Sequence, residues 1–75
     1  MLELEQHEGV VLRVNEAGLG IVKDAHSQRQ FVFTFDKIRG YRGEKARELG
    51  LIVGAHVRFN ATADHQVISV ELIKP

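Results

Sequence analysis

The sequence contains no cysteine, so disulfide bonds and thiolate-bound zinc are excluded. A secretory signal peptide begins with a basic segment followed by an apolar one. Residues 1–9 are acidic instead, so we expect no signal peptide. No apolar run approaches the ~20 residues that a membrane-spanning helix requires. We therefore expect a cytoplasmic protein with no membrane partner.

The chain also has no excess of charge of either sign, because ten Lys and Arg balance ten Asp and Glu. A net charge of zero gives no support for nonspecific binding to a polyanion. Residues 37–47 nevertheless carry five cations and one acid, Glu44, which is a local charge of +4. This basic segment is either an ordinary solvated surface or an electrostatic footprint for phosphates. Its cations are Lys37, Arg39, Arg42, Lys45 and Arg47.

A chain of 75 residues can build one hydrophobic core but not two, so we expect a single domain spanning residues 1–75. Five short segments have the β-branched, aromatic or alternating composition of strands. They are residues 10–14, 19–23, 31–35, 56–61 and 67–73. Residues 43–50, "GEKARELG", predict a helix of about two turns, because good helix formers precede a terminal glycine. This order predicts an all-β OB-fold, a five-stranded Greek-key barrel, with a short helix between strands three and four.

Three stretches of the sequence resemble the cold-shock domain, a family of OB-fold proteins. "GVVLRVNEAGLGIV" (9–22) is similar to the family's opening strand and first ribonucleoprotein motif, and "QFVFTFDKI" (30–38) is similar to the second motif. "LIVGAHVRF" (51–59) is similar to a later strand. The resemblance covers residues 9–73 and implies a function in binding single-stranded RNA or DNA.

The family binds its ligand by stacking bases on exposed aromatic side chains, and each such contact contributes ~1–3 kcal/mol. Six positions of this sequence correspond to that stacking set, and only the last of them keeps a ring. The six are Arg13, Leu19, Ile21, Val32, Thr34 and Phe35. An arginine plane can stack on a base, so Arg13 is a partial substitute. An aliphatic patch rimmed by charges such as Arg13 and Lys23 is equally typical of a protein-binding surface.

The core is predicted from strand alternation together with the apolar positions of the family. On an ideal strand Phe31, Phe33 and Phe35 lie on one side, and Val32 and Thr34 on the other. The resemblance assigns the first two phenylalanines to the core. The predicted core residues are Val11, Val22, Phe31, Phe33, Leu51, Val57, Phe59 and Val70.

Tyr41 is the aromatic residue outside the strands, and it lies between Arg39 and Arg42. It has two interpretations. It can cover the barrel mouth next to the helix, or it can stack on a base while the neighbouring arginines hold phosphates.

Neither a metal centre nor a catalytic site is expected. The four histidines (7, 26, 56 and 65) have no helical i, i+4 spacing, and no cysteine or acidic cluster completes a site. Asp24, His26 and Ser27 are the residue types of a catalytic triad, but three neighbours on a hairpin tip provide neither a pocket nor an oriented base. We expect no enzymatic activity, no catalytic residue and no cofactor.

The sequence therefore predicts a small binding module whose ligand is single-stranded nucleic acid, with RNA ahead of DNA. The alternative is a protein-interaction module that has lost nucleic-acid binding. Either one is expected to be a monomer or a weak homodimer. The predicted nucleic-acid contacts are Arg13, Leu19, Ile21, Lys23, Val32, Thr34, Phe35, Lys37, Arg39, Tyr41 and Arg42.

Overall fold

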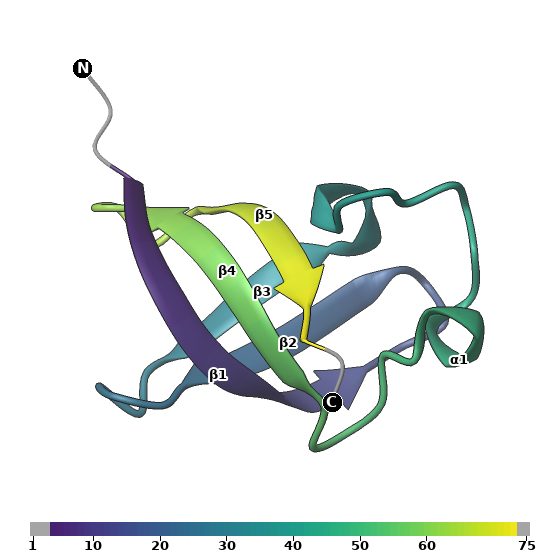
Figure 1. Ribbon diagram of the computed structural model, residues 1–75, viewed down its shortest axis with the longest axis horizontal. Helices are drawn as coiled ribbons and strands as arrows, with labels where there is room; N and C mark the ends of the chain where they lie inside the picture. The colour runs from purple at the N-terminus through teal and green to yellow at the C-terminus, as the bar shows by residue number, and fades with distance from the viewer. Residues whose placement is uncertain (1–3, 74–75) are drawn as a thin grey trace.

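In the computed structural model, which describes residues 4–73, five strands form one strongly curled antiparallel sheet in the order β3-β2-β1-β4-β5 (Figure 1). The strands are β1 (Leu4–Val14), β2 (Leu19–Asp24), β3 (Gln30–Thr34), β4 (His56–Thr62) and β5 (Val67–Leu72). A 3-10 turn, η1 (Phe35–Lys37), follows β3, and a single helical turn, α1 (Ala46–Leu49), precedes β4. The prediction of an all-β chain with five strands is confirmed.

Strand β1 is the central strand of the sheet, and its first part pairs with β4 and its second part with β2, while Gly9 and Val10 pair with both. The first half pairs with β4, from Leu4 opposite Thr62 to Val10 opposite His56. The second half pairs with β2 and ends with Val14 opposite Gly20. The predicted start of this strand at residue 10 is therefore wrong. After Leu4, residues 5–9 are polar or glycine and have little strand propensity, so their extended structure comes from pairing with a strand about fifty residues later.

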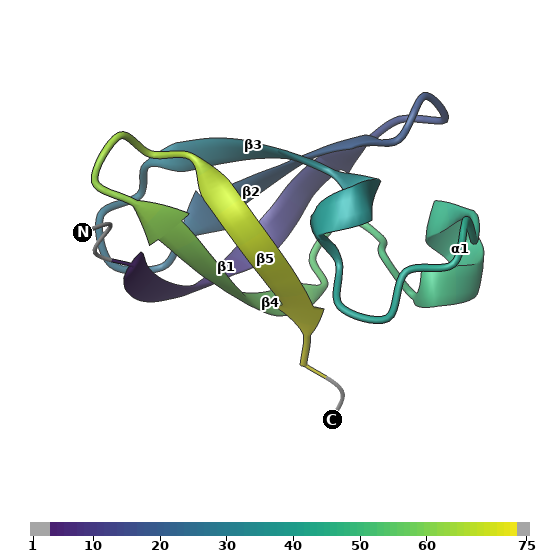
Figure 2. The ribbon, with the colours of Figure 1, turned by 90° about the horizontal axis from the view of Figure 1, so that it is seen from above.

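The two edge strands, β3 and β5, or residues next to them in the chain, come into contact at both ends of the open side of the sheet. At one end Ile38 forms a parallel bridge with Val70, and the Arg39 N–H donates a hydrogen bond of 2.9 Å to the Val70 carbonyl. Figure 2 shows η1 lying beside β5 in this region. At the other end the ring centroids of Phe31 and His65 are 5.7 Å apart. The sheet is thus a half-barrel whose open side is narrowed at both ends, which is compatible with a small barrel.

The core fills the inside of this half-barrel. All eight core residues predicted from the sequence are buried, and Phe35, Ile38, Ala61 and Val67 join them. Gly20 shows how tightly the inner face is packed, because a Cβ atom added there would lie 2.5 Å from the Phe33 ring. The ring centroids of Phe31 and Phe59 lie 5.1 Å apart across the core.

The helix is shorter than predicted. The sequence predicts about two turns over residues 43–50, whereas α1 comprises only residues 46–49. Gly43 lies outside the helix with φ +88°, a left-handed conformation that glycine adopts without strain. Gly50 ends the helix with φ +77°, and its N–H bonds to the Ala46 and Arg47 carbonyls. The glycine therefore predicts the end of the helix correctly, whereas the predicted start of the helix is wrong.

Candidate nucleic-acid interface

Six of the predicted contact residues lie on the side of β1, β2 and β3 that points away from the core. We call this side the outer face. The strand register aligns Arg13 with Ile21, and Ile21 with Val32, so these three side chains form a row across the strands. Leu19 lies opposite Thr34 one step further along. The residues of the outer face that the sequence predicted are Arg13, Leu19, Ile21, Lys23, Val32 and Thr34.

A β-bulge turns Arg13 toward the outside. Val11 pairs with Val22 and Arg13 pairs with Ile21. Strand β1 therefore advances by two residues where β2 advances by one. Val11 is fully buried and Arg13 is two positions later, so plain alternation would point the arginine into the core. The extra residue, Leu12, reverses the phase and leaves Arg13 exposed. Bulges are known to re-aim side chains in this way.

The outer face is aliphatic rather than aromatic among the residues that the structure describes. Val32 is 59% exposed and Leu19 is 40% exposed, while Ile21 between them is half-buried. Phe35, which the family resemblance assigned to the stacking set, is buried in the core because it continues the alternation of Phe31 and Phe33. The strand pattern therefore predicts the environment of Phe35 correctly, and the resemblance does not.

The structure divides the cations of the basic segment. Lys37 lies in η1, and together with Val32 and Thr34 it lines a groove of about 410 Å³ beside the outer face. Arg39 lies nearer to β5, where its guanidinium is 3.8 Å from the Glu71 carboxylate. Both side chains of that pair are more than half exposed, so the pair stabilises the fold little. Arg42 lies beyond Gly40 in the loop toward α1, and its backbone N–H donates to the Glu44 carboxylate.

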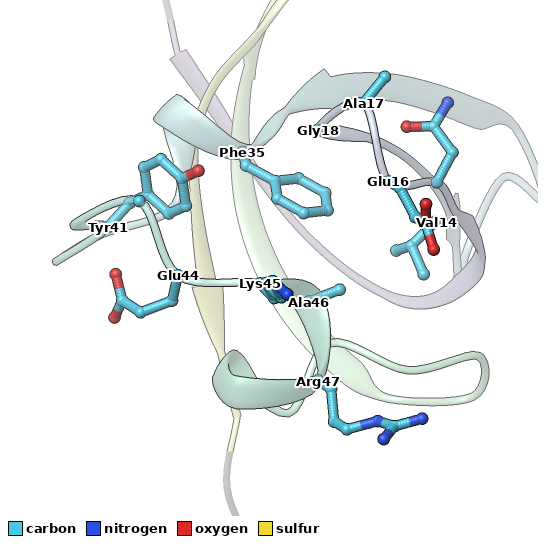
Figure 3. Close-up of a pocket in the computed structure, with 12 residues that line it drawn as sticks. Val14, Glu16, Ala17, Gly18, Phe35, Tyr41, Glu44, Lys45, Ala46 and Arg47 are labelled. Carbon is cyan, nitrogen blue, oxygen red and sulfur yellow. The ribbon is translucent and has the colours of Figure 1, made fainter.

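A larger pocket, with a volume of about 730 Å³, lies between the β1–β2 turn and the segment that carries α1 (Figure 3). Its walls come from residues 14–18 on one side and residues 43–47 on the other, with Phe35 and Tyr41 between them. Tyr41 is half-buried and packs edge-on against Phe35, with ring centroids 6.2 Å apart. It thus covers the core at this end and also lines the pocket. Sequence reasoning missed the pocket, because its walls are about thirty residues apart in the chain.

Asp24 is a buried carboxylate at the end of β2. One of its oxygens accepts hydrogen bonds from the Ser27 hydroxyl at 2.7 Å and the Ser27 N–H at 2.9 Å, and the other lies 3.4 Å from His7 Nδ1. Burial by itself would raise the pKa of Asp24. The Ser27 hydrogen bonds and the neighbouring His7 outweigh that effect, so the pKa lies below its ordinary value of 3.8. Asp24 therefore holds the β2–β3 turn as an ionised acceptor.

The histidines are dispersed over the structure. His7 stacks on Phe59 with ring centroids 5.1 Å apart, His65 contacts Phe31 and Arg29, and His26 and His56 are exposed. Residues 4–73 contain no group of three or more histidine, aspartate or glutamate side chains that could hold a metal ion. No helix in the same range is long and apolar enough to cross a membrane.

Comparison of the chain with protein-family models, with curated protein sequences and with solved structures yields no match. A function for this protein therefore has to be inferred from its residues and their geometry.

Proposed function

We propose that this protein binds single-stranded nucleic acid, RNA or DNA, on its outer face, and that its half-barrel is a divergent OB-fold. The observation that carries the proposal is the row of Arg13, Ile21 and Val32, which the β-bulge completes. In OB-folds the face of strands two and three is the surface that binds oligonucleotides. The strand order and the parallel bridge between Ile38 and Val70 support this fold.

The ligand would be held by two kinds of contact. The exposed aliphatic side chains and the plane of Arg13 would support bases, while Lys23 and Lys37 would pair with phosphates at the margins of the face. Because no described residue of this face has an aromatic ring, the base contacts are weaker than the ~1–3 kcal/mol of a stacked ring. Affinity should then depend strongly on salt. The two phosphate contacts of Lys23 and Lys37 correspond to a slope of about −1.4 in log K against log salt for single strands.

The test is fluorescence anisotropy of labelled single-stranded RNA and DNA oligonucleotides, starting at low salt. The diagnostic variant is Val32→Glu, which puts a negative charge in the middle of the outer face at an exposed position. Val53→Glu is the matched control, because Val53 is 66% exposed and lies in the loop before β4. We expect Val32→Glu to abolish binding and Val53→Glu to bind like the unmodified protein. Equal loss in both variants would show only a general effect of charge, and it would refute the outer face as the interface.

The aliphatic character of the outer face favours a second candidate, a protein-interaction module. Leu19, Ile21 and Val32 form a patch of apolar side chains with Arg13 and Lys23 at its margin, an arrangement that occurs at protein-binding surfaces. Complete absence of binding to every single strand at low salt would shift the conclusion to this candidate. The same Val32→Glu and Val53→Glu pair would then map a protein partner.

A further inference from the structure

The pocket between residues 14–18 and 43–47 is lined in part by aromatic side chains, unlike the described residues of the outer face. In Figure 3 the Phe35 ring points into the middle of the pocket, with Val14 across from it and Ala46 below. Tyr41 closes the side next to Phe35. The volume of about 730 Å³ lies within the ~300–1,000 Å³ that is typical of small-ligand sites. The lining is therefore mixed, with apolar and aromatic side chains beside polar and charged ones, and the pocket is large enough for a planar ring.

The pocket lies at one end of the outer face, because residues next to Arg13, Leu19 and Thr34 in the chain line it. Arg13 lies on the outer face and Val14 lines the pocket. Thr34 lies on the outer face, and Phe35, the next residue, lines the pocket. On β2 the same step leads from Leu19 back to Gly18, whose carbonyl accepts a hydrogen bond of 2.9 Å from the Phe35 N–H. Since consecutive side chains of a strand point to opposite faces, a ligand on the outer face would reach the pocket only by passing over the ends of these strands.

The charges at the mouth distinguish between the parts of such a ligand. Glu16 lines the mouth, and its carboxylate would repel a phosphate but can accept a hydrogen bond from a base. The Asn15 side-chain oxygen already accepts the Leu19 N–H at 3.0 Å, which leaves its amide group to donate. The opposite wall carries Glu44 together with Lys45 and Arg47, and these two exposed cations can hold a phosphate outside the mouth. A ring with polar edges, joined to a phosphate, fits this arrangement.

We infer that the pocket receives one base at the end of a single strand bound on the outer face. This inference rests on the proposed function and adds to it a site at which a base is enclosed rather than laid on a surface. The half-buried Tyr41 ring supplies an aromatic wall, and Phe35, which is only 5% exposed, contributes the small part of its ring that faces the pocket. The enclosed base would then provide the aromatic contact that is absent from the outer face of the described chain.

The experiment compares the unmodified protein and two variants, each with two ligands. The protein variant is Ala46→Phe, which fills the pocket from its floor, and Ala63→Phe in the exposed β4–β5 loop is the matched control. The ligands are a single strand of about eight nucleotides and the same strand with abasic residues at either end. For the full strand we expect Ala46→Phe to weaken binding about tenfold, within the range of one lost base contact. For the strand that lacks the enclosed base we expect no further loss, because both changes remove the same contact.

A second measurement reports on the pocket itself. Tyr41 is the only tyrosine in the sequence, so its ring protons give a unique NMR signal. We expect these signals to move upfield when the full strand binds, and to remain in place with the strand whose terminal base is missing. If Ala46→Phe does not fold, Ala17→Phe fills the pocket from the exposed turn on the opposite wall.

The outcomes separate this inference from the proposed function. The inference is overturned if Ala46→Phe binds the full strand as tightly as the unmodified protein does. It is also overturned if the losses of affinity from the variant and from the abasic strand add up. Either result leaves the outer face as the interface. If the unmodified protein binds no single strand at low salt, both proposals fail.

Discussion

Replacement of Phe33 by alanine tests the assignment of the inner and outer faces of β3. Phe33 is 3% exposed, and its ring lies directly over Gly20 on the neighbouring strand. Truncation of a buried phenylalanine typically costs ~3–5 kcal/mol, because transfer free energy is lost and a cavity remains. A domain of this size has a total stability of about 4–11 kcal/mol, from ~0.05–0.15 kcal/mol per residue. The substitution should therefore remove a large part of the free energy of unfolding.

The assay is thermal unfolding followed by circular dichroism. A loss of ~3–5 kcal/mol corresponds to a fall in Tm of about 12–40 °C, at ~4–8 °C per kcal/mol for a domain of 60–100 residues. Val32→Ala is the control on the same strand, because Val32 points outward and is 59% exposed. Its Tm should change little, since exposed substitutions usually alter stability by less than ~0.5 kcal/mol. If Phe33→Ala also leaves the Tm nearly unchanged, as is expected for Val32→Ala, the assignment of the inner and outer faces of β3 is wrong.

Gly20 adds a more demanding test of the same contact. A Cβ atom at this position would lie 2.5 Å from the Phe33 ring, so Gly20→Ala alone should destabilise the protein. When Phe33 is already alanine, the new methyl group enters the vacated space and should cost much less. The two substitutions should therefore be non-additive, as expected for residues in contact. Additive losses in Tm would refute the close packing of Gly20 beneath Phe33.

Three further predictions concern charge and metal. Because the pKa of Asp24 is lowered by folding, its contribution to stability is present above its ordinary pKa of 3.8 and is lost as the pH falls below it. Melting curves between pH 6 and pH 2 should therefore show a smaller acid-induced fall in Tm for Asp24→Asn than for the unmodified protein. Replacing Lys23 and Lys37 together by alanine should flatten the salt slope of oligonucleotide binding by about 1.4, at ~0.7 per phosphate contact; an unchanged slope would exclude both lysines. Neither a strong chelator nor equimolar zinc should shift the Tm, and a Tm that rises with zinc concentration would reveal a site.

The residues along each strand specify much of this fold. Alternation in residues 31–35 correctly predicts which side chains are buried, and it does so even for Phe35, where the family resemblance gave the other answer. All eight predicted core residues are buried, because burial in a strand follows a period of two that can be read locally. The glycine at position 50 likewise predicts the end of α1 from its own conformational freedom.

Contacts between distant segments decided the rest. Residues 5–9 have little strand propensity of their own and become part of the first half of β1 because β4 pairs with them. The bulge at Leu12 is a property of the pairing between β1 and β2, and it determines that Arg13 faces outward although two-residue alternation from Val11 points inward. The large pocket exists only where the turn at residues 15–18 faces the segment at 43–47. Local sequence carries the period of each strand, whereas register, bulges and pockets depend on which strands meet, and only the folded chain brings those partners together.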